Sequence, residues 1–291
     1  MDSLTLSDDE IVERCQNCDF YPSQLLSDES SGRKILKVSA DVVVKFGPGV
    51  THQEASAQQL AFQNVNHVVL RIPQVYRFFT RLDSDCGFTG YLIMENIEGL
   101  TLDQMEWNDP RLLERIVAGL NELHAIRSKY PGPVSGGEAH GSLWSEYGSG
   151  TTFQHVRDLE SYINDKLAYF QTAISMSDED LCLCHMDVAP RNFMMDLCGR
   201  LCLLDWATAG FFHRYFELWA IEFAQHVMGT NFGPELLQKL NATPTEKEGI
   251  QKLNLVYRYN SHYTSYRLSD NTDSIMAAVA KASNPSTAIS S

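Results

Sequence analysis

The sequence has no apolar run long enough to span a membrane, and it is poor in basic residues. Its 291 residues include 23 lysines and arginines against 37 aspartates and glutamates, a formal net charge of −14. Nucleic acids and anionic membranes are bound largely through lysine and arginine, so this balance argues against both partners. A transmembrane helix needs about 20 consecutive apolar residues, and no such segment occurs. We therefore expect no nucleic-acid and no membrane partner.

The chain also lacks the features of an exported protein. Its first ten residues are acidic and have neither the basic region nor the apolar run of a signal peptide. The seven cysteines are an odd number, and Cys182, Cys184 and Cys202 stand in apolar segments, as small buried hydrophobic residues do. Cys15 and Cys18 have metal-site spacing, but no second such pair completes a zinc site. These observations predict a reducing, cytoplasmic location.

One segment, from Cys184 to Trp206, carries most of the functional signal. It contains His-x-Asp ending at Asp187, then Asn192 five positions later and Asp205 thirteen positions after that. The residues around Asp187 include a proline and no helical period, which predicts a loop. Two short apolar runs separated by a glycine predict a hairpin that begins at Asn192 and ends at Asp205. The ends of a hairpin lie together, so these oxygen-bearing side chains should form a site suited to Mg²⁺, with Asp187 one loop away.

This segment resembles the catalytic loop of the aminoglycoside phosphotransferase and choline kinase-like family, a branch of the protein kinase-like superfamily. The shared motif is H-x-D, an asparagine five residues later, and D-W at a strand end. The aromatic-rich segment from Ala209 to Glu217 is similar to the versions common in fungi. The resemblance covers roughly residues 33 to 230. It implies a bilobal α+β fold with a small antiparallel-sheet N-lobe and a mainly helical C-lobe.

The resemblance implies a role for each residue of the motif. Asp187 is the expected catalytic base, and Asn192 and Asp205 are expected to hold Mg²⁺. His185 is expected to brace the loop, and Arg191 to steady the loop or to approach phosphate. Ordinary structural roles remain open for each: a loop cap for Asp187, a turn residue for Asn192, a strand-end acceptor for Asp205 and a surface position for Arg191.

A lysine at the end of a valine-rich strand is the expected contact to ATP or GTP. Lys45 follows three valines, where an ammonium group is costly unless it is paired or reaches water. By resemblance it contacts the α- and β-phosphates and pairs with Glu54, in a helix predicted from about His52 to Asn64. Glu95 and Ile97 lie in a polar segment similar to the hinge of the family, where backbone groups bind the adenine ring.

Hydrophobic periodicity and turn residues divide the chain into four parts. We expect an N-terminal extension (1–32), a nucleotide-binding N-lobe (33–97), a C-lobe with the catalytic loop and substrate site (98–282), and a disordered tail (283–291). Strands are predicted at about 33–38, 42–46, 74–80 and 89–94. Helices are predicted at about 8–15, 52–64, 109–129, 152–174, 216–228, 234–240 and 245–266.

Three departures from the wider kinase pattern bear on the substrate. No G-x-G-x-x-G loop precedes Lys45. The part that covers the nucleotide phosphates in protein kinases is therefore missing, which leaves retained catalysis open. Ala189 replaces a lysine found in many protein serine/threonine kinases, and no A-P-E segment occurs. The last two departures argue against protein substrates.

The sequence therefore predicts an ATP- and Mg²⁺-dependent kinase for a hydroxyl of a small-molecule substrate. An antibiotic, a sugar, an amino alcohol and a secondary metabolite all remain open as acceptors. We expect the helices after Ala209 and the loop around Trp144 and Tyr147 to enclose the acceptor. Two alternatives remain: a catalytically inactive kinase-like binding module, and a kinase-like fold recruited to a different reaction in fungal metabolite biosynthesis.

Overall fold

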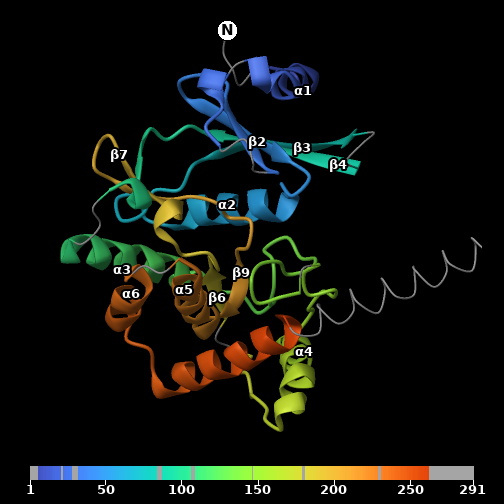
Figure 1. Cartoon of the computed structure of the whole chain (residues 1–291), viewed down its shortest axis with the longest axis vertical. Helices are drawn as coiled ribbons and strands as arrows, with labels where there is room; N and C mark the ends of the chain where they lie inside the picture. The colour runs from blue at the N-terminus through green and yellow to red at the C-terminus, as the bar shows by residue number, and fades with distance from the viewer. Residues whose placement is uncertain are drawn as a thin grey trace, which may run out of the picture.

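The computed structural model describes residues 6–20, 22–27, 32–83, 87–105, 109–145, 147–178, 181–228 and 231–261. These residues form two lobes, with an antiparallel sheet in the N-terminal lobe and most helices in the C-terminal lobe (Figure 1). The predicted α+β, two-lobed architecture is confirmed. The predicted tail, residues 283–291, lies outside the described residues.

The N-lobe is built on a four-stranded antiparallel sheet with the strand order β1-β2-β4-β3. Its strands are β1 (Lys34–Lys37), β2 (Val42–Gly47), β3 (Val75–Asp83) and β4 (Gly87–Glu95). All four strands were expected from their β-branched and aromatic composition. The boundaries differ from the predictions by up to three residues.

The two faces of this sheet are covered by different helices. Val44 of β2 packs in one cluster with residues of α1 (Asp8–Gln16), while Leu92 of β4 packs with Ala55 of α2 (His52–Asn64). Figure 1 shows α1 and α2 on opposite sides of the sheet. Side chains alternate along a strand, so Lys45 lies on the face opposite Val44, toward α2. The predicted limits of α2 are confirmed.

The N-terminal extension forms part of the N-lobe core. Ser7 caps α1, and Glu10 completes a capping box with it. The buried cluster shared by the extension and the outer face of the sheet comprises Leu6, Ile11, Cys15, Cys18, Leu36, Val42, Val44, Tyr91 and Ile93. Burial raises the pKa of Cys15 to about 12, so its thiol behaves as a hydrophobic group.

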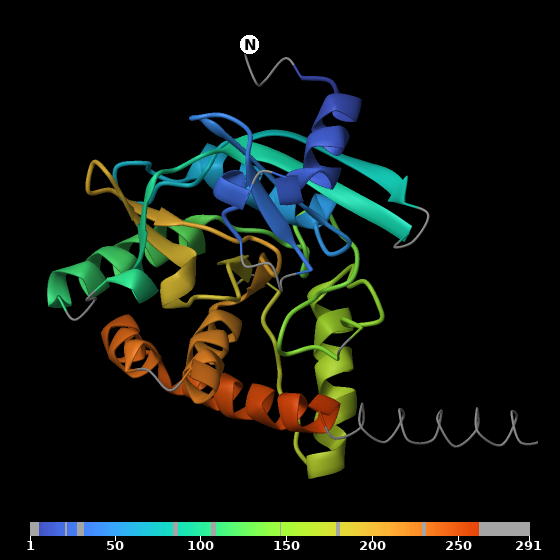
Figure 2. The same ribbon diagram turned by 45° about the horizontal axis from the view of Figure 1, so that its top comes forward.

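The C-lobe places helices around two small sheets. One sheet has the order β5-β7-β8, and the other pairs β6 with β9. In both views the helices of this lobe lie below the N-lobe (Figures 1 and 2). The elements are β5 (Gly99–Thr101), α3 (Pro110–Ala125), α4 (Val156–Leu167), β6 (Leu181–Cys184), β7 (Phe193–Asp196), β8 (Leu201–Leu203), β9 (Gly210–His213), α5 (Arg214–Met228), α6 (Phe232–Leu240) and a helix over 244–261.

Two predicted helices are too long. α3 ends at Ala125, four residues early, because the chain becomes extended at Ile126 and Arg127 pairs with Cys182 of β6. α4 covers 156–167 instead of 152–174, since it begins at a capping box made by His155 and Asp158. Residues 262–266 of the last predicted helix lie outside the described part of the chain. None of the described helices has both the length and the apolar character needed to cross a membrane.

Candidate active site

The β7–β8 hairpin brings the two predicted metal-binding residues to the same end of a small sheet. Phe193 of β7 pairs with Leu203 of β8, and Leu204 donates its N–H to the carbonyl of Asn192 at 2.8 Å. Asp205 follows directly, with a φ of 62° that aspartate adopts more readily than most residues. The hairpin geometry expected from the two apolar runs is present.

Asp187 and Asn192 are joined directly within the loop that precedes the hairpin. Asn192 Nδ2 lies 2.9 Å from Asp187 Oδ2 and 2.7 Å from the Asp187 carbonyl oxygen. Arg191 Nη2 donates to both carboxylate oxygens of Asp187, at 2.6 and 2.7 Å. The Asp187 side chain is 29% exposed, so the carboxylate is accessible while its orientation is fixed by two neighbours.

Lys45 links the N-lobe to Asp205. Its Nζ lies 2.5 Å from Glu54 Oε1 and 2.9 Å from Asp205 Oδ1. Burial by itself would lower the pKa of Lys45, but the two carboxylates outweigh burial and raise that pKa above its usual value. Burial would likewise raise the pKa of Asp205, yet the Lys45 ammonium lowers it. The site therefore holds a charged lysine beside a carboxylate whose side chain is 40% exposed.

His185 is hydrogen-bonded to the loop that carries Asp187. It is fully buried, its Nε2 lies 2.9 Å from the Leu204 carbonyl, and its Nδ1 accepts the N–H of Asp187 at 3.3 Å. Both ring nitrogens are thus occupied by the protein backbone. Its ring also meets the edge of Trp206, with centroids 5.0 Å apart. This arrangement ties the loop around Asp187 to the strand end before Asp205.

Glu217 on α5 binds the backbone of the same loop, a role that the sequence did not reveal. Its Oε2 accepts the N–H of His185 at 2.6 Å, and its Oε1 accepts the N–H of Met186 at 2.8 Å. Met186 has a φ of 65°, a left-handed conformation that costs about 1–2 kcal/mol for such a residue. The fully buried carboxylate offsets that cost by binding both N–H groups.

The segment expected to bind adenine has two residues with different surroundings. The Glu95 carboxylate lies 2.5 Å from Arg71 Nη2 and also accepts the N–H of Gln74. Arg71 in turn lies 2.6 Å from Asp196 at the β7–β8 turn. The side chain of Glu95 therefore joins the lobes, which the sequence did not indicate. Ile97 is buried at the start of the connection to the C-lobe.

A cavity of about 160 Å³ opens beside Asp187. Its lining includes Asp187 and Arg191 from the loop, and Ala220, Phe223 and Ala224 from α5.

Trp144 was expected in a loop that encloses the acceptor. It is instead a core residue, 4% exposed. It packs against three aromatic rings of the C-lobe, those of Phe153, Tyr162 and Phe212.

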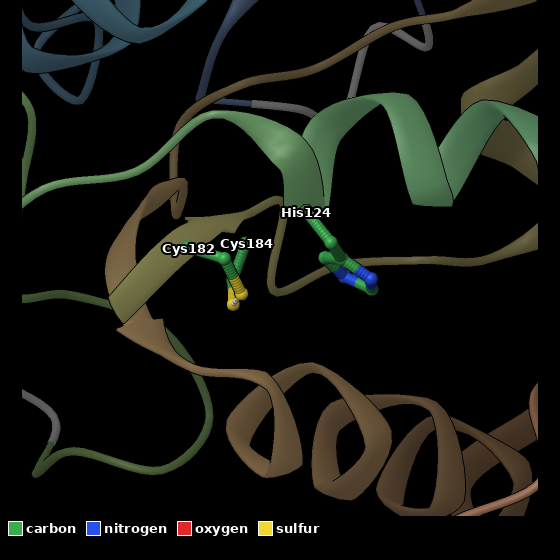
Figure 3. Close-up of side chains that lie close together, drawn as sticks. All are labelled: His124, Cys182 and Cys184. Carbon is green, nitrogen blue, oxygen red and sulfur yellow. Dashed lines mark hydrogen bonds between the residues drawn. The ribbon is translucent and has the colours of Figure 1, made fainter. Parts of the chain in front are cut away.

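A second group of potential metal ligands lies between α3 and β6. His124 projects from α3 beside Cys182 and Cys184 of β6 (Figure 3), and the ligand atoms lie within 4.8 Å of one another. Both thiols donate to the carbonyl oxygen of Phe212, at 3.5 and 3.8 Å. Burial raises the pKa of the Cys184 thiol well above its usual range. Metal binding requires thiolates, so the raised pKa of Cys184 and the contacts of both sulfur atoms to the Phe212 carbonyl favour a packing role for this cluster.

The donors at the hairpin end suit Mg²⁺ better. Asp205 supplies a partly exposed carboxylate, and Asn192, whose Nδ2 is directed to Asp187, supplies a carboxamide oxygen. Mg²⁺ is usually held by one or two carboxylates together with substrate phosphates and water. The residues present therefore fit a magnesium–nucleotide complex.

Solved structures with the same architecture include aminoglycoside phosphotransferases. APH(4)-Ia aligns over 91% of this chain and 94% of its own, with a TM-score of 0.57 and 18% identity. The GDP complex of aminoglycoside 2'-phosphotransferase-IIIa aligns over 86% of this chain and 88% of its own, with a TM-score of 0.50 and 16% identity. These likenesses show the protein kinase-like fold that the catalytic-loop motif predicted.

The family follows from the sequence match. The model of the phosphotransferase enzyme family matches residues 24–253, and the chain belongs to this family. Ethanolamine kinase 2 of Mus musculus is 25% identical over 138 residues, which are 46% of this chain and 36% of that protein. The match thus spans little more than a third of that relative's length.

Proposed function

We propose that this protein transfers a phosphoryl group from ATP or GTP, bound with Mg²⁺, to a hydroxyl group of a small organic molecule. The observation that carries the proposal is the position of Lys45 Nζ, which contacts Glu54 of the N-lobe and Asp205 of the C-lobe. Asp187 lies on the loop that leads to the same hairpin. Together these groups place a cation that can neutralise phosphate charge beside a carboxylate that can orient a hydroxyl.

In this proposal each residue has one task. Lys45 contacts the nucleotide phosphates and is kept in place by Glu54. Asn192 and Asp205 hold Mg²⁺, which when bound supplies neutralisation of phosphate charge. Asp187 orients the acceptor hydroxyl and takes its proton. His185 positions the loop that carries Asp187, as its two backbone contacts indicate.

The connection between the lobes is the proposed site for the nucleotide base. Within the described part of the chain, the backbone of Ile97 makes no hydrogen bond, so its N–H and C=O are the proposed partners. Glu95 fixes this segment through Arg71. We keep both ATP and GTP as candidates, since neighbouring structures hold AMP-PNP or ADP in one enzyme and GDP in another.

The relatives support a small-molecule acceptor. The curated relative is named for ethanolamine, and the neighbouring structures contain hygromycin B or kanamycin. The absence of an A-P-E segment in the sequence supports the same reading. The cytoplasmic location and the fungal type expected from the sequence remain predictions.

The proposal is tested by acceptor-dependent ADP formation with ATP and Mg²⁺, using mass spectrometry to detect a product heavier by one phosphoryl group. Asp187→Asn is expected to lower turnover by about 10²–10⁴-fold, the usual contribution of a general base. Formation of a product without a phosphoryl group would instead support the recruited-reaction alternative. Undiminished turnover in Asp187→Asn would contradict the assigned role.

A non-catalytic nucleotide-binding module is the second candidate. The observation that favours it is the pairing of Arg191 with both oxygens of Asp187. The proposed base is therefore already bound by a cation. Binding of ATP and Mg²⁺ without ADP formation across a broad set of hydroxyl compounds would support this candidate over the first.

A further inference from the structure

We propose that the acceptor is a hydroxy acid, whose carboxylate pairs with Arg191 while its hydroxyl meets Asp187. This inference rests on the proposed function and names the chemical class of its substrate. Its basis is the cavity beside Asp187, in which one cation and a set of apolar groups face the same space.

The charge of the cavity sets the first constraint. Among the described residues that line it, Asp187 is the one acid and Arg191 the one base. An acceptor bearing an ammonium group is normally held by carboxylates, and the one carboxylate in this lining already lies 2.6 Å from Arg191. The lining therefore favours an acceptor that brings its own negative charge. Because the whole chain carries −14, that recognition must be local to Arg191.

The chemistry of Arg191 sets the second constraint. A guanidinium binds carboxylates in a planar, two-pronged geometry, and it exchanges one carboxylate for another without changing its own charge. Arg191 is 44% exposed, so an incoming anion can reach it. When the acceptor carboxylate takes Arg191, the Asp187 carboxylate is released to receive the hydroxyl proton. Acceptor binding and activation of the base are thereby coupled.

The short distance between the two groups sets the spacing within the acceptor. Arg191 Nη2 lies 2.6 Å from Asp187 Oδ1, so the hydroxyl and the carboxylate of the acceptor must be close to each other. One or two carbon atoms between them, as in α- and β-hydroxy acids, meet this requirement.

An apolar wall of the cavity constrains the polarity and the size of the rest of the acceptor. Phe223 stacks on Trp219 with ring centroids 5.2 Å apart and packs on Tyr257 at 4.6 Å. Trp219 is itself fixed by a hydrogen bond to Asn254. With Ala220 beside it, this wall presents a rigid apolar surface to the cavity. The volume of about 160 Å³ is below the roughly 300–1,000 Å³ of pockets for drug-sized ligands, which favours a single ring or short chain.

The test compares three probes that share a phenyl ring and a benzylic hydroxyl: mandelate, its neutral amide mandelamide, and the amine 2-amino-1-phenylethanol. The β-hydroxy acid 3-hydroxy-3-phenylpropanoate is added as the longer homologue. Binding is measured by calorimetry on the full chain with Mg²⁺ and a non-hydrolysable ATP analogue. Transfer is measured separately with ATP as phosphorylated product.

We expect one of the two acids to bind about 10- to 100-fold more tightly than the amide or the amine, the range for a charge-assisted hydrogen bond. Arg191→Gln should remove that preference, and Arg191→Lys should keep part of it. Arg111→Gln, at an arginine that is 88% exposed on α3, is the matched control and should leave the preference intact.

Equal binding of acid, amide and amine, failure of both acids to bind, or an unchanged preference in Arg191→Gln would each overturn the inference. Preferred binding of an acid without any phosphorylated product supports the anion site and overturns the proposed phosphotransfer. The two failures are therefore distinguishable.

Discussion

Glu217 accepts a 2.6 Å hydrogen bond from the backbone N–H of His185, and so fixes the loop after β6 to α5. Burial alone would raise the pKa of Glu217, but nearby His124 and the loop lower it, and the carboxylate stays ionised. Met186 donates to the other carboxylate oxygen at 2.8 Å. The loop that carries Asp187 is therefore held by a buried charge from an element some 30 residues later in the chain.

Replacing this buried carboxylate should destabilise the protein and impair catalysis. Glu217→Ala leaves two N–H groups without their acceptor, at a cost of about 1–3 kcal/mol for each unsatisfied group. Urea unfolding followed by fluorescence measures the loss. Glu235→Ala, at an exposed position on α6, is the control and should change the free energy of unfolding little. Equal effects of the two substitutions would argue against the role of Glu217.

The Lys45–Glu54 pair should show strong coupling in a double-mutant cycle. Lys45→Met leaves the Glu54 carboxylate buried and unpaired, which is expected to cost about 3–5 kcal/mol of stability. The double variant Lys45→Met/Glu54→Met removes both charges and should be more stable than Lys45→Met alone. Additive effects in urea unfolding would show that the two residues do not interact as the structure indicates.

The N-terminal helix should contribute to the stability of the N-lobe. Ile11 is 1% exposed against the outer face of the sheet, and truncation of a buried isoleucine to alanine typically costs about 2–5 kcal/mol. Ile11→Ala should therefore lower the midpoint of thermal unfolding, whereas the exposed neighbour change Glu13→Ala should not. A midpoint unaffected by Ile11→Ala would place α1 outside the cooperative core.

The contribution of Asp205 to stability should be constant near neutral pH and disappear in acid. Its folded-state pKa lies below the ordinary value of 3.8, so the carboxylate is ionised in both states above that value. The difference in unfolding free energy between the wild type and Asp205→Asn should thus be flat from about pH 5 to 8. The difference in unfolding free energy should shrink only as the pH falls below 3.8, the ordinary pKa, toward the lower pKa of the folded state. A difference that already declines between about pH 7 and 5 would contradict the lowered pKa.

Local patterns in the sequence were enough to predict the four strands of the N-lobe sheet, α2 and the β7–β8 hairpin. Each depends on the spacing of apolar residues and turn formers within a short segment. The pairing of Lys45 with Glu54 was inferred by resemblance, and the structure contains it. The ends of α3 and α4 were misplaced because they are set by β6 pairing and by a capping box, which apolar periodicity does not report.

The supports of the site could not be predicted from the sequence. Glu217 binds backbone N–H groups, and nothing in its neighbourhood distinguishes it from another helical glutamate. Arg71 binds both Glu95 and Asp196, which lie 24 and 125 residues further along the chain, and no local pattern encodes these contacts. Trp144 was expected in a loop that encloses the acceptor, but the tertiary fold buries it in the aromatic core.

The central claim is that Lys45, Asn192 and Asp205 hold ATP together with Mg²⁺. Calorimetric titration of the purified chain with ATP, with and without Mg²⁺, tests it without knowledge of the acceptor. We predict Mg²⁺-dependent binding in the wild type and in Asp187→Asn, and loss of the Mg²⁺ dependence in Asp205→Asn. Binding that is indifferent to Mg²⁺ in the wild type, or unchanged in Asp205→Asn, would contradict the account.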